Sequence, residues 1–151
     1  MNLTESGDIV RWPETHYVFV EKTGPIPKIA QDAWQLAHSL APLLAEKNPI
    51  TGYMSLYKMN PNVYRAGFVV EEKPRRLPPG LQCELFGGRS YSRFVLTGPY
   101  SDLPAATGRV FDIVAQRGMA LRSDFCIESY VNDPLTTPED QLITEILIPT
   151  A

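Results

Sequence analysis

The sequence predicts an α+β fold made of two repeated modules in tandem, and three observations support this. Tyr17 and the run Thr23-Gly24-Pro25 recur as Tyr91 and Thr97-Gly98-Pro99, about 74 positions later. An apolar rhythm of helical spacing follows each Thr-Gly-Pro, and short runs rich in branched and aromatic residues flank both rhythms. A repeated unit that cannot bury its apolar face alone pairs with its copy. We therefore expect a pseudo-twofold arrangement with a central ligand groove.

The first module, about residues 8–72, reads strand, strand, helix, strand, strand. Branched and aromatic runs predict its strands, at Asp8–Trp12, Tyr17–Lys22, Tyr53–Met59 and Tyr64–Val70. A helix is expected from about Lys28, because its apolar positions fall on one stripe, namely Ile29, Ala33, Leu36, Ala37, Leu40 and Leu44. Pro42 cannot donate a backbone hydrogen bond, so we expect the helix to kink or end near it.

A charged, proline-rich linker at about residues 73–81 leads into the second module, about residues 82–149. Gln82–Phe86 is expected to pair with Tyr91–Thr97 across Gly87-Gly88. A helix should begin after Asp102 as N-cap, with Pro104 in its first turn, and stop at Gly118. Its stripe is predicted in the register of the first module, at Leu103, Thr107, Val110, Phe111 and Val114. Two strands complete the module, Phe125–Val131 and Leu142–Ile148. The prediction is thus an antiparallel sheet with helices on one face.

Composition indicates one globular domain over residues 1–151. With 151 residues, 44% of them hydrophobic, the chain can bury roughly 70% of its unfolded surface. A net charge of −3 argues against direct nucleic-acid binding, which needs clustered Lys and Arg. The N-terminus lacks a signal sequence and no run of 18 apolar residues occurs, so we expect a cytoplasmic protein with no membrane partner.

The few cysteines and histidines favour neither a metal site nor a cofactor. Cys83 and Cys126 make no disulfide framework, and their spacing fits no zinc pattern. His16 and His38 are isolated in the sequence, although His16 could touch the rim of a cleft.

Alternation along the third strand of each module separates two faces. The more apolar face, with Met54 and Leu56 in one copy and Ile127 in the other, is expected to lie under the helix. The other face carries aromatic and polar side chains, which we expect to line the groove: Tyr53, Ser55 and Tyr57 in the first copy, and Cys126, Glu128 and Tyr130 in the second.

Glu128 is the leading candidate, because a carboxylate is disfavoured in mid-strand and its counterpart is only Ser55. Two interpretations stay open: a desolvated carboxylate that awaits a cation, or an ordinary solvated charge. Trp34, whose counterpart in this register is Gly108, either leans over the groove or packs at the edge of the core. Tyr17 and its counterpart Tyr91, likewise, either close the groove or pack as strand aromatics.

Four stretches carry a resemblance to a known family: Phe86–Phe94, Thr97–Tyr100, Glu128–Pro134 and Thr144–Pro149. They resemble the GyrI-like effector-binding family, which includes drug-binding domains of multidrug-responsive transcription activators, stand-alone DNA gyrase inhibitory proteins and some small hydrolases. The resemblance implies paired α+β modules around a central ligand cavity. It also implies that Glu128 reaches into this cavity to meet cationic ligands, with Tyr130 beside it.

The resulting hypothesis is a stand-alone protein that binds hydrophobic, cationic small molecules for sequestration or effector sensing. Its expected ligand-binding residues are Glu128, Tyr130, Tyr57, Tyr53, Tyr91, Trp34, Ser55, Cys126 and Tyr17. Two alternatives remain. One is a small hydrolase of strained-ring toxins that uses Glu128 as general base. The other is a DNA gyrase inhibitory protein, for which gyrase, or a separate regulator, would be the protein partner.

Overall fold

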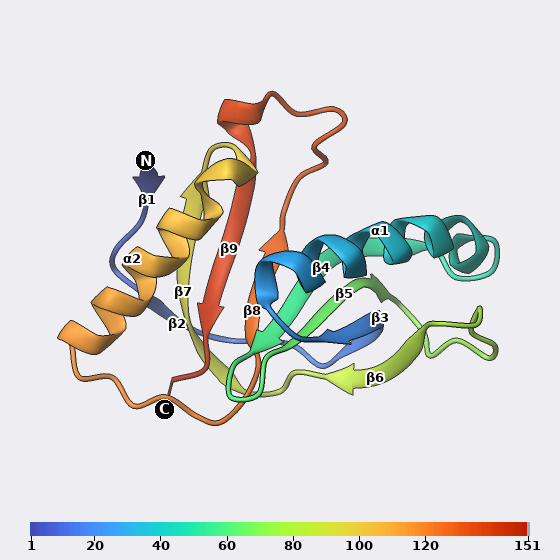
Figure 1. Ribbon diagram of the computed structural model, residues 1–151, viewed down its shortest axis with the longest axis horizontal. Coiled ribbons are helices and arrows are strands. Elements are labelled where there is room, and N and C mark those ends of the chain that lie inside the picture. Colours follow the sequence, from blue (N-terminus) through green and yellow to red (C-terminus); the bar gives the residue numbers. More distant parts are fainter. Residues whose placement is uncertain (151) are drawn as a thin grey trace. The chain divides into compact units, whose positions relative to one another are not determined.

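The computed structural model describes residues 1–150 and confirms a mixed α+β fold with antiparallel strand pairs (Figure 1). The described residues form nine strands, two α-helices and two short 3₁₀ turns. The chain divides into two compact units. Unit 2 is continuous, from Pro13 to Gly88, whereas unit 1 combines Met1–Trp12 with the chain from Arg89 onward.

Unit 2 contains four strands in the order β4-β5-β3-β6 and one helix. Its elements are β3 (Thr15–Thr23), α1 (Ile26–Ala45), β4 (Ile50–Lys58), β5 (Val63–Val70) and β6 (Gln82–Phe86). Every neighbouring pair is antiparallel. Helix α1 packs on β5 and β3, so the core of this unit lies between the helix and the two inner strands.

Unit 1 repeats this plan with the order β1-β7-β9-β8, and β2 also pairs with β7. Its elements are β1 (Asn2–Leu3), β2 (Asp8–Arg11), β7 (Ser90–Thr97), the 3₁₀ turn η1 (Tyr100–Asp102), α2 (Leu103–Gln116), β8 (Cys126–Tyr130), the 3₁₀ turn η2 (Glu139–Gln141) and β9 (Ile143–Ile148). Helix α2 packs on β7.

The first strands of the two modules are exchanged, so the predicted hairpin between Gln82–Phe86 and Tyr91–Thr97 is wrong. Strand β6 pairs with β3 instead, and β2 pairs with β7. The Gly87-Gly88 pair makes no hairpin turn. Gly87 has φ +123°, and a Cβ there would lie 2.1 Å from the Pro13 carbonyl oxygen. Its missing side chain serves a close backbone approach at the entrance to β3 rather than a two-residue turn.

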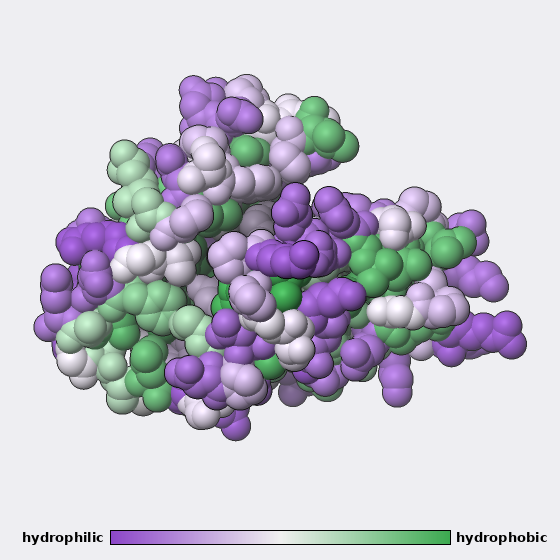
Figure 2. All heavy atoms as spheres, in the orientation of Figure 1, coloured by the Kyte–Doolittle hydropathy of each residue, from purple (hydrophilic) through white to green (hydrophobic). Residues whose placement is uncertain are grey.

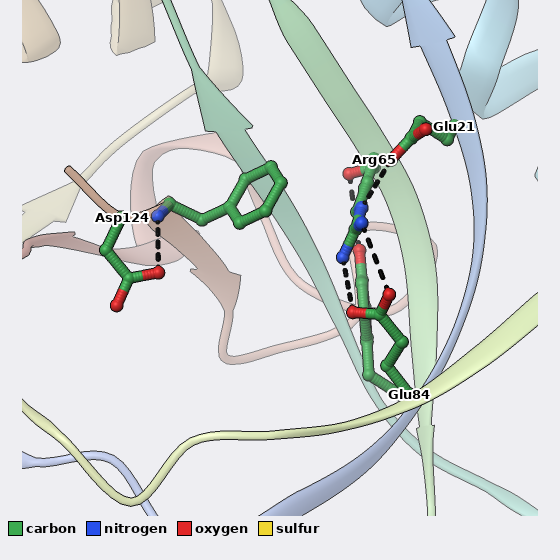
Figure 3. Close-up of polar contacts among 6 residues, drawn as sticks. Glu21, Arg65, Glu84 and Asp124 are labelled. Carbon is green, nitrogen blue, oxygen red and sulfur yellow. Dashed lines mark hydrogen bonds and ion pairs between the residues drawn. The ribbon is translucent and has the colours of Figure 1, made fainter.

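A network of ion pairs joins the exchanged strand β6 to β3 and β5 (Figure 3). The Arg65 guanidinium on β5 crosses the Phe19 ring of β3, with its carbon 4.3 Å from the ring centroid. It donates to Glu21 at 2.8 Å and to Glu84 of β6 at 2.7 Å. The Arg65 side chain is only 12% exposed, while Glu84 is 51% exposed. One side chain thus links three adjacent strands and holds the exchanged strand to its host.

Helix α1 continues through Pro42 and ends at Ala45, three residues later, which agrees with the prediction that it kinks or ends near this proline. Pro42 and His38 are both exposed. Because proline has no N–H, the His38 carbonyl lacks its usual helical donor. This part of the helix is exposed, so water can donate to that carbonyl instead. The predicted stripe is buried as expected at Ile29, Ala33, Ala37 and Leu44.

Helix α2 is rotated relative to the prediction. Its buried residues are Ala106, Val110, Ile113 and Val114, whereas Thr107 and Phe111 of the predicted stripe are only half-buried. The turn η1 precedes α2, and α1 has no such turn. A 3₁₀ helix has about 3.0 residues per turn against about 3.6 in an α-helix, so three residues of it rotate the following helix by roughly 60°. Corresponding residues of the two helices are therefore 73 positions apart in the sequence, one fewer than the predicted 74.

The viewed surface mixes polar and apolar side chains. On the face in Figure 2, hydrophilic residues are dispersed among smaller hydrophobic areas. Within residues 1–150, no helix is long and apolar enough to cross a membrane.

A Schellman motif ends α2. Gly118 has φ +62°. Its N–H donates to the Ala115 carbonyl at 3.1 Å, and the Met119 N–H donates to the Val114 carbonyl at 3.1 Å. The predicted stop at Gly118 is therefore confirmed. The predicted N-cap, Asp102, occupies the cap position but makes no side-chain capping bond.

Two glycines offer a matched stability test, because a Cβ at Gly118 or at Gly108 meets nothing within 4 Å. Gly118→Ala should destabilise the protein by about 1 kcal/mol, since an L side chain disfavours positive φ. Gly108→Ala, inside α2, should stabilise it by about 0.5–1 kcal/mol through helix propensity. Urea denaturation measures both. Changes of the same sign would show that backbone conformation does not govern this helix end.

Candidate functional site

Helix α1 covers the aromatic and polar face of unit 2, so the sequence-based assignment of faces is wrong. Tyr53, Ser55 and Tyr57 of β4 lie opposite Phe68, Ala66 and Tyr64 of β5. The helix reaches this face, because Trp34 contacts both Ser55 and Phe68. The apolar floor that the helix needs comes from β3 and β5, where Val18, Val20, Ala66 and Phe68 share that face. Alternation on β4 alone could not reveal this.

The Trp34 indole is anchored by two hydroxyls. Its Nε1–H points at Ser55 Oγ and Tyr64 Oη, each 3.0 Å away. These two hydroxyls lie 2.6 Å apart and share a hydrogen bond of their own. The indole also meets Phe68 edge to face at 6.3 Å and lies 5.2 Å from the His38 ring. The half-buried indole thus has a fixed orientation.

Further rings extend this cluster along β4. Tyr57 is buried and stacks on Tyr64, with centroids 6.5 Å apart. Tyr53 is 41% exposed and packs edge to face on Phe68 at 5.4 Å. Aromatic faces attract cations. We refer to Trp34, Ser55, Tyr57, Tyr64 and Phe68 as the indole cluster.

In unit 1 the corresponding face of β8 carries a carboxylate instead. The Tyr130 hydroxyl donates to Glu128 Oε1 at 2.9 Å, which confirms that these two side chains share a face. The Tyr100 ring, from the turn that opens α2, meets Tyr130 edge to face at 5.5 Å. In this unit too, the face of the sheet that α2 covers is therefore the face that carries the polar side chains of β8. We refer to Glu128, Tyr130 and Tyr100 as the carboxylate cluster.

Glu128 is desolvated without a cationic partner. Burial raises the pKa of this carboxyl above its usual value of 4.5, and the hydrogen bond from Tyr130 lowers it by a smaller amount. Among residues 1–150, no salt bridge to Glu128 occurs. Burial in the same region raises the pKa of Tyr100, and nearby Asp133 adds to this. A half-buried carboxylate that accepts from a neutral phenol and forms no salt bridge within residues 1–150 favours a cation.

The loop after β8 fixes the end of this strand. The Asn132 side chain forms two hydrogen bonds with the backbone near the start of β9. Its side-chain oxygen accepts from the Ile143 N–H at 2.9 Å, and its Nδ2 donates to the Gln141 carbonyl at 3.0 Å. The Asp133 carboxylate accepts from the Leu135 N–H at 2.8 Å. These two residues of the resemblance motif hold the strand that carries Glu128, and their side-chain bonds are structural.

Tyr17 and Tyr91 lie on the opposite sheet faces from the two clusters. The buried Tyr17 hydroxyl donates to the Met54 carbonyl at 2.9 Å. Its ring lies over Gly67, where a Cβ would come within 2.8 Å of it. Tyr91 is buried beside the Arg122 guanidinium, and burial raises its pKa to about 12. Within unit 2 Tyr17 therefore lies on the other side of the sheet from Ser55, and within unit 1 Tyr91 lies on the other side from Glu128. Cys126, by contrast, shares the face of Glu128 and is buried.

Sequence reasoning missed three members of the clusters. Tyr64 and Phe68 lie on β5 and Tyr100 lies in η1, and the repeat marked none of them. Strand pairing could have indicated Tyr64, because it lies opposite Tyr57. Among residues 1–150, no group of three His, Cys, Asp or Glu side chains could hold a metal ion.

Comparison with known proteins identifies the family. Residues 8–151 match the GyrI-like small molecule binding domain. The chain belongs to this family. Its relatives by structure include the EcmrR C-terminal domain, with TM-score 0.78, 15% identity, and 99% of this chain and 97% of that chain covered. EcmrR in complex with DNA gives TM-score 0.76 and 17% identity, and this GyrI-like chain covers only 57% of it, with 99% of its own length aligned.

A third similar structure is SAV2435 bound to tetraphenylphosphonium, with TM-score 0.69, 15% identity, and 100% of this chain and 94% of that chain covered. No curated protein matches this GyrI-like chain by sequence. At these identities the likeness to solved structures concerns the fold.

The desolvated carboxylate predicts an unusual dependence of stability on pH. Because the folded-state pKa of Glu128 lies above 4.5, this carboxyl stays protonated to a higher pH in the folded state than in the unfolded state. Stability from this residue is therefore lost as pH rises from about 4.5 through the folded pKa. Glu128→Gln removes the charge and can still accept the Tyr130 bond.

The Glu128→Gln variant should gain free energy of unfolding relative to wild type between pH 4 and pH 8, as measured by urea denaturation at each pH. Glu145→Gln is the matched control, because Glu145 lies on the other face of the same sheet and pairs with Arg93. A difference between Glu128→Gln and wild type that stays flat over this range would mean that water solvates the carboxylate.

Proposed function

We propose that this GyrI-like domain binds hydrophobic cations and that the carboxylate cluster recognises their charge. The single observation that carries the proposal is Glu128, a desolvated carboxylate that accepts one hydrogen bond from a phenol. An ionised carboxyl loses several kcal/mol of hydration on burial unless an opposite charge compensates it. A bound cation supplies this compensation, and the Tyr130 and Tyr100 rings add aromatic attraction of about 0.5–2 kcal/mol each.

The family and its relatives support this ligand class. The family is described as small-molecule binding, and SAV2435 binds tetraphenylphosphonium, a permanent cation with four phenyl rings. That compound carries its charge at phosphorus and has no proton donor, so a carboxylate can recognise it only through charge. The indole cluster offers a second aromatic surface, which we propose as a contact for apolar parts of ligands.

The biological role that fits these properties is effector sensing or sequestration of toxic cations. EcmrR supports the former, because a domain of this fold occurs there in a protein that forms a complex with DNA. A sensor of this kind needs a separate or additional DNA-binding component, since a net charge of −3 does not favour contact with phosphate. Sequestration needs only the binding site itself.

The binding test uses tetraphenylphosphonium and isothermal titration calorimetry. Wild-type protein should bind with an affinity that rises with pH, because only the ionised Glu128 attracts the cation. Glu128→Gln should weaken binding at least tenfold, equivalent to about 1.4 kcal/mol, and remove the pH dependence. Glu145→Gln deletes the same charge from the opposite face and should bind like wild type. Equal affinity in the wild type and in Glu128→Gln would overturn the proposal.

A second candidate function is hydrolysis, favoured by the raised pKa of Glu128. A carboxylate with such a pKa is suited to act as general base: it would take a proton from water while the resulting hydroxide attacks an electrophilic ring carbon. The carbon's bond to its leaving atom then breaks, and that atom receives the proton.

The two functions differ in turnover. Incubation of the protein with a cyclopropane-bearing electrophile, followed by mass spectrometry, should give no product heavier than the substrate by one water molecule if binding is the function. Such a product, formed by wild type and not by Glu128→Gln, would instead establish the hydrolase.

A further inference from the structure

The two units share one frame at an offset of 73 residues. Ala33 and Ala37 of α1 correspond to Ala106 and Val110 of α2, and all four side chains are buried. The same offset relates Ser55 to Glu128 and Tyr57 to Tyr130. In this frame the counterpart of Trp34 is Thr107 rather than the Gly108 that the sequence register predicted. The exposed Gly108 lies on the open side of the helix.

In unit 2 the position over the third-strand polar group is filled. The indole of Trp34 supplies two things to Ser55: an aromatic ring packed against Phe68 and an N–H donor at 3.0 Å. A helix side chain at this position therefore reaches the third strand when it is as long as tryptophan.

In unit 1 the equivalent helix position carries only the short side chain of Thr107, which is half-buried. At the 73-residue offset, the third-strand residue that corresponds to Ser55 is Glu128, so a carboxylate replaces a hydroxyl there. A carboxylate has about four acceptor sites, and Glu128 uses one of them for Tyr130. The helix position that corresponds to Trp34 thus supplies neither an aromatic ring nor an N–H donor in unit 1.

We infer that the aromatic ring of a bound cation takes, over Glu128, the place that the Trp34 indole takes over Ser55, and that Thr107 is the residue that leaves room for it. This inference rests on the proposed function and refines the ligand class. The favoured ligands carry an aromatic ring directly attached to the cationic centre, as in aryl-phosphonium, aryl-ammonium and aryl-amidinium compounds. Thr107 then determines which ring sizes enter.

The test enlarges the side chain at position 107 and measures tetraphenylphosphonium binding by calorimetry. Thr107→Val keeps the volume and should bind within about twofold of wild type. Thr107→Leu should bind about tenfold more weakly, and Thr107→Trp about a hundredfold or more, because the new side chain takes the ring's place. Gly108→Trp is the matched control: it adds the same indole one residue away on the exposed side and should leave the affinity unchanged.

A second measurement reports on the geometry without ligand. In Thr107→Trp, the indole N–H resonance should move downfield as Glu128 ionises, and this movement should vanish in Thr107→Trp with Glu128→Gln. If Thr107→Trp does not fold, the Leu variant decides: wild-type affinity there would overturn the inference. Wild-type affinity in a folded Thr107→Trp variant would also overturn the inference, and weaker binding in Glu128→Gln would then leave the proposed function intact. Unchanged binding in Glu128→Gln would instead overturn the proposed function itself.

Discussion

The antiparallel register of the inner strands is the constraint on which the rest of each unit depends. Since directly opposed residues share a face, the pairing of Ser55 with Ala66 in unit 2 and of Glu128 with Ile146 in unit 1 assigns every side chain to one side of its sheet. A slip of one residue would move Glu128 away from the helical side. Helix coverage, the two clusters and the exclusion of Tyr17 all follow from this register.

Two units with one frame have acquired different chemistry at the same place. Trp34 donates to both Ser55 and Tyr64 within unit 2. Unit 1 has Glu128 and Thr107 at the matching positions, and within residues 1–150 no salt bridge compensates the charge of this carboxylate. In the function that we propose, divergence at these two positions makes one half a support and the other the surface that recognises the ligand.

The energetics of Glu128 explain why such a site suits binding. A hydrogen bond to a charged group contributes about 1.5–3 kcal/mol, which is less than the several kcal/mol that an ion loses on leaving water. The bond from Tyr130 therefore orients the carboxylate without compensating for its desolvation, as the raised pKa indicates. The desolvation cost is present before any ligand binds. In the function that we propose, a cation that relieves this cost therefore binds more tightly than its contacts alone would allow.

Local patterns in the sequence determined the α+β class, both helices, the stop of the second helix at Gly118, and the shared face of Glu128 and Tyr130, because each depends on residues close together in the chain. Four separate motifs identified the family. Tertiary structure alone decided the rest. Strands β2 and β6 occupy corresponding positions in the two predicted modules. Each pairs with a strand of the other module, and local sequence patterns do not determine which of two distant strands is the partner. The face under α1 depends on β3 and β5 jointly, and the rotation of α2 depends on the 3₁₀ turn before it. Pairing across the sheet, rather than the repeat, added Tyr64 and Phe68 to the indole cluster, because contacts between strands are fixed only when the chain folds.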